Sequence, residues 1–259
     1  MQKRSDRQGR FKTVDMRRFI VLAPFLLLDS AMAGGQSFPE PFFPSGAGTV
    51  LVYEIRNADG MTQVLKSDSV AVFSGDFTHG QATVISSLFS GDSLYVRNEV
   101  PVVFDRGEVI IDMVSLMEKA MQDGMKEAMN DTVGGEEDEE LKSMKKVLEK
   151  MTVKGECRGI PADMEVGMEL PDYWIEVKVM FFSPKMEYRD RRVTGRETVT
   201  TPAGTFDCFV VEETMTSKAM MSTEKTRQVS WYARGVGLVK QQTWEKKQLT
   251  GTTLLTAVR

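Results

Sequence analysis

The sequence predicts a mainly β protein of the β-rich α+β class, in which a curved antiparallel sheet or half barrel carries a two-helix insert. Two observations predict this architecture. Short runs that alternate apolar and polar residues, broken by Gly, Asn and Asp, fill residues 48–104 and return after Thr152. Between these blocks, methionines recur every fourth residue, which is the spacing of one helix face. The chain has 259 residues, a length that one all-β domain can reach.

Each apolar run of the first block predicts a strand, and each break predicts a tight turn. Connections this short make neighbours in sequence antiparallel neighbours in the sheet. The expected strands are 50–55, 62–73 (as one long strand or two), 82–89 and 93–97, with turns at 57–60, 74–76 and 91–92.

The middle segment, residues 108–151, predicts a pair of helices inserted between the two β blocks. The first helix carries the methionine stripe, and the second begins in the acidic cluster Glu136–Glu140. Acidic residues at its start and lysines further on suit the dipole of the second helix. The stripe consists of Met113, Met117, Met121, Met125 and Met129, and the second apolar face of Leu141, Met144, Leu148 and Met151.

The second β block is built around a hairpin in the stretch Arg192–Glu213. Pro202 presets one turn position and Gly204 permits a positive φ, so the two alternating runs on either side should pair. An apolar strand over 174–182 precedes the hairpin. The strands expected after it are 228–232, 238–244 and 250–258, with turns at 234–237 and 246–247.

The N-terminus predicts export. After Met16, a basic pair at 17–18, an apolar run over 19–28 and the small-x-small sequence at 31–33 are typical of a secretory signal peptide cut after Ala33. Met16 is then the expected initiator, and residues 1–15 are interpreted as an over-called start that precedes it. The apolar run of about ten residues is far below the roughly 20 that span a bilayer. No cysteine lies at the cleavage site, so we expect no stable membrane anchor and a periplasmic or secreted protein whose single domain covers 34–259.

Composition supports a packed, acidic protein. The chain is 41% hydrophobic and 27% charged, and its formal net charge is −4. Residues 34–259 keep 26 Lys/Arg against 34 Asp/Glu, a net charge of −8. This balance argues against nucleic acid and anionic membrane surfaces as partners.

Five blocks of the C-terminal half resemble the TapB-like family of uncharacterised secreted bacterial proteins. PAGTF and WYxxGVGLVK are the specific parts of a resemblance that covers most of Gly155–Arg259. That family is similar in shape to the lipoprotein-carrier (LolA/LolB-like) group, in which a strongly curved antiparallel sheet forms a half barrel closed by helices. The resemblance implies a fold and a cavity, and it implies no catalytic residue. The blocks are Gly159–Pro161, Val166–Asp172, Val193–Phe209, Trp231–Gln241 and Thr250–Val258.

No enzyme is predicted. Gly91-Asp92-Ser93-Leu94 spells the GDSL block of a class of esterases, but that block needs an α/β sheet and a downstream histidine, and the only histidine, His79, precedes it. A glycosidase would need two facing carboxylates, which the pattern does not establish. One His and two Cys provide no zinc-ligand spacing. We therefore expect no catalytic residue, no metal site and no cofactor.

The two cysteines, Cys157 and Cys208, are candidates for a disulfide, because a secretory signal implies an oxidising compartment. A bond between them would stabilise the fold by about 4 kcal/mol on the chain-entropy estimate. The alternative is two buried free thiols.

The methionine stripe leaves two interpretations open. Met117, Met121 and Met125 could line a pocket for an apolar or lipid-like ligand in the concave face, because methionine adapts to varied apolar partners. The stripe could equally be core that packs the insert on the sheet. The leading hypothesis is a non-enzymatic binding protein for such a ligand. The competing hypothesis is an envelope assembly protein that binds a protein partner through a sheet edge or the acidic insert.

Overall fold

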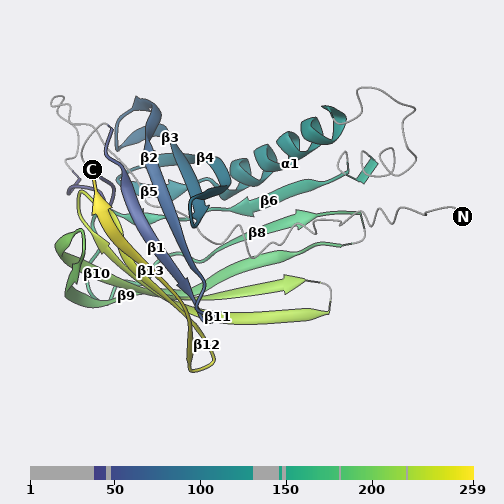
Figure 1. The fold of residues 1–259 in the computed structure, drawn as a ribbon. Helices are drawn as coiled ribbons and strands as arrows, with labels where there is room; N and C mark the ends of the chain where they lie inside the picture. Colours follow the sequence, from purple (N-terminus) through teal and green to yellow (C-terminus); the bar gives the residue numbers. More distant parts are fainter. Residues whose placement is uncertain (1–37, 45–47, 131–145, 148–149, 181, 220) are drawn as a thin grey trace, which may run out of the picture.

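The computed structural model describes residues 38–44, 48–130, 146–147, 150–180, 182–219 and 221–259 (Figure 1). It contains one long helix, α1, over Met113–Asn130. Its strands are β1 Leu51–Asn57, β2 Thr62–Gly75, β3 His79–Ser90, β4 Ser93–Asp105, β5 Glu108–Ile111, β6 Thr152–Glu156, β7 Ile160–Pro161, β8 Tyr173–Lys178, β9 Lys185–Thr201, β10 Gly204–Ala219, β11 Ser222–Ala233, β12 Gly237–Glu245 and β13 Gln248–Val258.

These strands form a single sheet in the order β6-β8-β9-β10-β11-β12-β13-β1-β2-β3-β4-β5-β7, and every neighbouring pair is antiparallel. The mainly β prediction is confirmed. Most connections are hairpins between strands adjacent in sequence, as the short predicted turns require.

The sheet is strongly curved, and its largest apolar cluster shows which face is concave. This cluster joins Val84 and Val100 of β3 and β4 to Ile175 and Met186 of β8 and β9, although these strands lie near opposite ends of the strand order. Side chains so far apart in a sheet can share a cluster only if the sheet bends around them. The helix α1 contributes Met117 to the same cluster, so it packs against the concave side, between β4 and β6 (Figure 1).

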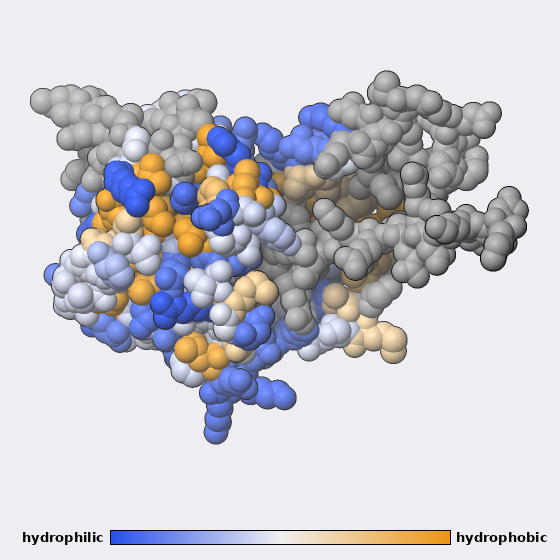
Figure 2. Space-filling view, in the orientation of Figure 1, coloured by the Kyte–Doolittle hydropathy of each residue, from blue (hydrophilic) through white to orange (hydrophobic). Residues whose placement is uncertain are grey.

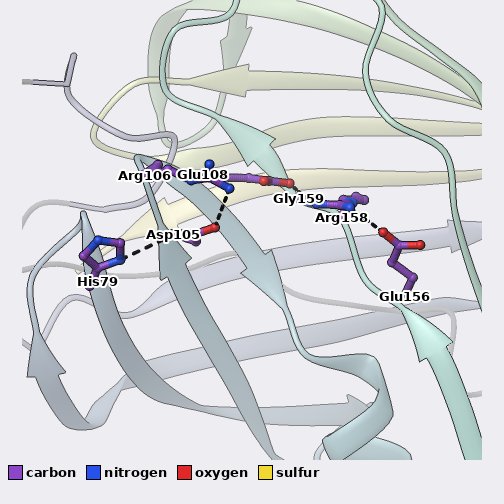
Figure 3. Close-up of polar contacts among 7 residues, drawn as sticks. All are labelled: His79, Asp105, Arg106, Glu108, Glu156, Arg158 and Gly159. Carbon is purple, nitrogen blue, oxygen red and sulfur yellow. Dashed lines mark hydrogen bonds and ion pairs between the residues drawn. The ribbon is translucent and has the colours of Figure 1, made fainter.

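The two edges of the sheet are joined by one short piece of chain. β6 lies at one edge and β7 at the other, and only residues 157–159 separate them in sequence. Gly159 lies in this crossing, where a Cβ atom would come within 1.9 Å of the carbonyl oxygen of Val109 in β5. The carboxylate of Glu108 accepts a hydrogen bond from the Gly159 N–H, and Arg158 pairs with Glu156 (Figure 3). The sheet is therefore not closed by strand pairing but bridged by the crossing and covered by α1.

The first and last strands pair at the centre of the sheet. β1 lies between β13 and β2, with Leu51 opposite Val258 and also opposite Ser67. The pairing continues past the strand ends, because the N–H of Val50 donates to the Arg259 carbonyl at 2.7 Å and the Arg259 N–H donates back at 3.0 Å.

The predicted insert is confirmed only in part. Residues 108–111 form β5 rather than the start of a helix, because Val102–Asp105 of β4 offer them a strand edge to pair with. The first helix is confirmed from Met113, and Asp112 caps it by accepting a hydrogen bond from the Ser115 N–H at 3.0 Å. The second helix is not shown, because its predicted residues lie mostly outside the described ones. The predicted signal peptide lies wholly outside them. No helix of the described chain is long and apolar enough to cross a membrane.

Candidate ligand-binding site

The methionine stripe lies mainly in the core. Met113 and Met117 are each 6% exposed and belong to the cluster under α1, while Met121 is partly buried at its margin. The side chain of Met125 is outside the described part of the structure. These contacts satisfy the core interpretation for Met117, and a role of Met121 and Met125 in a pocket stays a prediction.

The proposed disulfide is absent from the structure. Cys157 and Cys208 are both free, and they belong to different surroundings. Cys157 packs against the cluster covered by α1, whereas Cys208 lies in a second cluster with Val210, Trp231 and Val239. The reason is topological, because the crossing that carries Cys157 follows the β5 edge and not the β9–β10 hairpin. The alternative of two buried free thiols is met in part, since both thiols are free, Cys208 is buried and Cys157 is half-buried.

A cavity of about 550 Å³ lies at the tip of the β9–β10 hairpin and is named here the hairpin cavity. Two other cavities of the described chain measure about 210 and 230 Å³. Ligand sites for small molecules typically measure about 300–1,000 Å³. The hairpin cavity is lined by Arg196, Glu197, Thr198, Thr205, Phe206, Asp207, Cys208, Phe209, Ala233 and Arg234.

Two arginines in this cavity share one aromatic ring. The Arg196 guanidinium lies 4.1 Å from the centre of the Phe209 ring, and that of Arg234 lies 5.6 Å from it. Phe42 packs edge-on against Phe209 at 5.4 Å and also contacts Arg234. Burial lowers the pKa of Arg234, and repulsion from Arg196 lowers it further. The cavity therefore holds two nearby positive charges over an apolar wall.

The hydrogen bonds of the two arginines differ. Arg234 Nη1 donates to the backbone carbonyl oxygens of Glu40 at 2.7 Å and Ala162 at 2.6 Å, which fixes its position. Arg196 makes no hydrogen bond or ion pair with any residue that the structure describes; its contact is the Phe209 ring. Its five N–H donors therefore face solvent and the cavity.

The acidic residues of the cavity are held by neutral partners. The Glu197 carboxylate accepts a hydrogen bond from Trp231 Nε1 at 2.7 Å, and Asp207 accepts one from the Thr198 hydroxyl at 2.7 Å. Each carboxylate is thereby oriented without neutralising an arginine. The lining thus offers separate positive and negative groups beside Phe206 and Phe209.

Strand register explains why these side chains meet. Arg196 of β9 pairs directly with Phe209 of β10, and Thr198 pairs with Asp207. In antiparallel strands, directly opposite residues place their side chains on the same face. Arg234 follows β11, whose Ala233 pairs with Cys208. The sequence predicts turns in these blocks and gives no signal that joins the two arginines. Arg234 opens the predicted turn over 234–237, and Arg196 lies within the strand before the turn at Pro202.

The single histidine lies elsewhere, at the start of β3 beside Asp105 at the end of β4 (Figure 3). His79 Nδ1 is 3.6 Å from Asp105 Oδ1, and Arg106 Nη2 donates to Asp105 Oδ2 at 3.1 Å. His79 begins β3, whereas Ser93 begins β4 beyond the far end of β3, about 35 Å away along the strand. The GDSL residues therefore form an ordinary hairpin turn and not a Ser–His pair. Within the described residues, no group of three or more His, Cys, Asp and Glu is placed to hold a metal ion.

A buried ion pair beside the loop over 159–171 serves the fold. Arg191, whose side chain is 3% exposed, pairs with Glu213 at 3.0 Å and donates to the carbonyl oxygens of Pro171 at 2.7 Å and Gly159 at 3.0 Å. A bulge between β9 and β10, where Asp190 has a φ of 56°, turns Arg191 toward this loop. All its described hydrogen bonds go to the protein itself, so it ties the loop and the crossing to the sheet.

Solved structures share this architecture. A Bacteroides fragilis protein assigned as exported, with a YmcC-like fold, is 18% identical with a TM-score of 0.60; the match covers 85% of this chain and 99% of that one. A Parabacteroides distasonis protein assigned as a lipoprotein is 19% identical with a TM-score of 0.61, covering 86% and 100%. At these identities the likeness concerns the fold. No curated protein matches the chain.

The sequence that forms the sheet also matches the model of one protein family. The match to the DUF3108-like family covers residues 46–255, from before β1 to within β13, and so includes the hairpin cavity and α1. The chain belongs to the DUF3108-like family.

Proposed function

We propose that this protein is an exported, non-enzymatic binding protein that holds a lipid-like ligand with an anionic group in the hairpin cavity. The observation that carries the proposal is the convergence of Arg196 and Arg234 on the Phe209 ring, with the donors of Arg196 left without a partner among the described residues. Planar guanidinium groups bind carboxylates and phosphates through paired hydrogen bonds.

The apolar part of the cavity supports an amphiphile rather than a small inorganic anion. Phe206 is partly exposed, Phe209 is buried beneath the arginines, and Ala233 is buried beside Cys208 in the neighbouring cluster. An acyl chain that covers Phe206 would remove apolar surface from water, which stabilises binding by about 25 cal/mol for each Å². The ligand that fits is therefore a fatty acid or an acidic lipid, with its charged group on Arg196.

The proposal includes export from the cytoplasm and a carrier role. The signal sequence ending at Ala33 supports export, as does the fold shared with proteins assigned as exported or as lipoproteins. The resemblance to TapB-like and LolA/LolB-like proteins extends the proposal to a carrier role. Met121 and Met125 remain proposed contacts for a longer apolar chain at the margin of α1.

The proposal predicts that binding depends on Arg196 and on the charge of the ligand. Titration of the purified chain with laurate and with dodecyl phosphate should give saturable binding by calorimetry, whereas 1-dodecanol, with the same chain and no charge, should bind at least 10-fold more weakly. Arg196→Gln should weaken the binding of laurate about 10- to 100-fold, which corresponds to one charge-assisted hydrogen-bonded contact.

Arg56→Gln provides the matched control, because Arg56 is an exposed arginine on β1 that does not line the cavity. It should leave laurate binding unchanged. Equal binding of laurate by wild type and Arg196→Gln would overturn the proposal. Binding of inorganic phosphate as tight as that of dodecyl phosphate would show an anion site without a lipid-like ligand. Native mass spectrometry with lipid extraction would identify a ligand retained during purification.

A second candidate function, binding of a protein partner in the cell envelope, is favoured by an apolar row on the convex face. Figure 2 shows apolar residues gathered over the region of β1 to β4. Register places Leu254, Val64, Phe89 and Leu94 in one row across β13, β2, β3 and β4, interrupted by Glu54 of β1. Leu94 is 55% exposed. Capture of one defined envelope protein by wild type, lost with Leu94→Ser, would support this function.

A further inference from the structure

We infer that the concave face holds a second binding site, for a neutral hydroxyl-rich ligand such as a sugar ring or polyol, centred on the amide of Gln228. The site is a cavity of about 230 Å³ between β10, β11, β12, β13 and β1. It is separate from the hairpin cavity, since the two have no lining residue in common.

Strand register places the lining of this inner cavity on the concave face. Met215 of β10 belongs to the cluster under α1 and pairs with Thr226 of β11. Gln228, two residues further on, therefore points to the same side. Gln228 pairs with Thr243 of β12, which in turn pairs with Gly251 of β13, so the same face continues across four strands.

Two largely buried polar side chains line the inner cavity with groups that are open to a ligand. Gln228 is 4% exposed and Thr226 is 7% exposed, yet within the described chain neither side chain makes a hydrogen bond. Their polar atoms are not sealed from the cavity, because the fully buried side-chain nitrogen or oxygen without a partner among the described residues is Trp244 Nε1. The amide of Gln228 can therefore donate to and accept from a ligand in the cavity. The neighbouring Gln241 differs, because its Nε2 donates to Ser230 Oγ at 2.9 Å.

The chemistry of the lining selects a neutral ligand. Amide and hydroxyl groups both donate and accept hydrogen bonds, as sugar hydroxyls do. Among the described residues that line the inner cavity there is no lysine, arginine or histidine, while Glu245 is present, so an anion would meet no positive side chain there. Ile55 and Met215 form an apolar part of the wall that suits the carbon face of a ring. The volume lies below the usual range for ligand sites, so one small unit is buried.

Saturation-transfer NMR tests this site with glucose, N-acetylglucosamine and glycerol as probes, each in the millimolar range, and with glucose 6-phosphate as the charged counterpart. Transfer to at least one neutral probe is expected, and it should be at least 10-fold weaker for glucose 6-phosphate than for glucose. Gln228→Leu should abolish the transfer, and Thr226→Val, which keeps the shape of the side chain, should weaken it about 10-fold.

Thermal unfolding distinguishes a ligand-binding amide from a structural one. Replacing an unpartnered buried amide by an apolar group of similar size is neutral or stabilising, so Gln228→Leu should keep the Tm or raise it by about 2–4 °C. Gln241→Leu, which removes a hydrogen bond that is made, should lower the Tm. A fall in Tm for Gln228→Leu, or the absence of transfer to every neutral probe, would overturn the inference and leave water as the occupant of the cavity.

Discussion

At the scale of single residues, Glu187 shows how this acidic protein uses its cations. Its side chain is 8% exposed and lies among Lys185 at 2.9 Å, Arg189 at 3.2 Å and Lys218 at 2.6 Å. Hydrogen bonds from Lys185 and Lys218 lower the pKa of Glu187 to about 2, against the opposing effect of burial. Three cations from β9 and β10 thus share one carboxylate. It links these two strands at the end of the pair that is farthest from the turn at Pro202.

This arrangement predicts a loss of stability in acid. Because the folded pKa lies below the unfolded value of about 4.5, the charged carboxylate stabilises the fold above pH 4.5. That stabilisation falls as pH drops from about 4.5 toward 2. Glu187→Gln should therefore lower the free energy of unfolding at pH 7 by about 1 kcal/mol, since the cations are partly exposed. Urea unfolding at pH 7, 4.5 and 3 measures the difference between variant and wild type.

The difference should shrink as the pH is lowered, because the wild-type carboxylate becomes protonated. Glu118→Gln, at an exposed position of α1, is the control and should change stability little at any pH. A difference between Glu187→Gln and wild type that stays constant from pH 7 to pH 3 would contradict the assignment.

At the scale of elements, the crossing between the sheet edges depends on the absence of a side chain at Gly159. A Cβ atom there would lie 1.9 Å from the Val109 carbonyl oxygen, which is backbone and cannot rotate away. Gly159→Ala should therefore push the crossing off β5 and destabilise the protein by roughly 2 kcal/mol or more. Urea denaturation followed by circular dichroism measures this effect.

Gly195→Ala is the matched control within β9. Nothing lies within 4 Å of the position that its Cβ would occupy, and its φ is not in the left-handed region. Alanine there should be neutral or slightly stabilising, by up to about 1 kcal/mol. Equal stability of the two variants would show that the crossing tolerates displacement.

The elements that sequence reasoning found are those bounded by turn chemistry. Gly60, Gly91, Gly204 and Gly235 all adopt positive φ at turns that the sequence predicts. The sequence predicts β10 and β11 too short and does not predict the hairpin that joins them, because no Gly, Pro or Asn marks the end of β10 at Ala219. β5 and β7 were missed because they are four and two residues long and exist through pairing with each other and with β4.

The candidate sites were harder to predict than the strands. Arg196 and Arg234 are 38 positions apart, and they meet only because β9, β10 and β11 pair in one register. Gln228 was placed in a strand, but its burial depends on the curvature of the whole sheet. The methionine repeat predicted α1 correctly, and the periodicity alone could not separate core from pocket, because both require an apolar helix face.

At the scale of the whole molecule, the two free thiols lie against different parts of one sheet. Cys157 packs under α1 and Cys208 lies near the hairpin cavity. Burial raises the pKa of both thiols, that of Cys208 to about 12, so both should react slowly with alkylating reagents in the folded state. Because a single sheet joins their surroundings, we predict that both thiols become reactive in the same unfolding transition.

Alkylation across a urea series, with no reductant and with mass spectrometry of the two peptides, measures this. The two labelling midpoints should coincide with the midpoint from circular dichroism, and two thiols should be labelled for each chain. Cys157→Ser provides a control in which Cys208 is labelled alone. Separate midpoints would show that the two ends of the sheet unfold independently, and fewer than two thiols would show that a disulfide forms in solution.

The central pairing of β1 with β13 has a consequence for how the chain folds as it is made. The first strand is complete early in synthesis, but its partner is the last strand to appear, about 190 residues later. Until then the exposed edge of β1 is open to wrong pairing, and contacts of such long sequence separation form slowly. A nascent chain lacking β13 should therefore need a holding chaperone, and release of the C-terminus should be the event that commits the protein to its final structure.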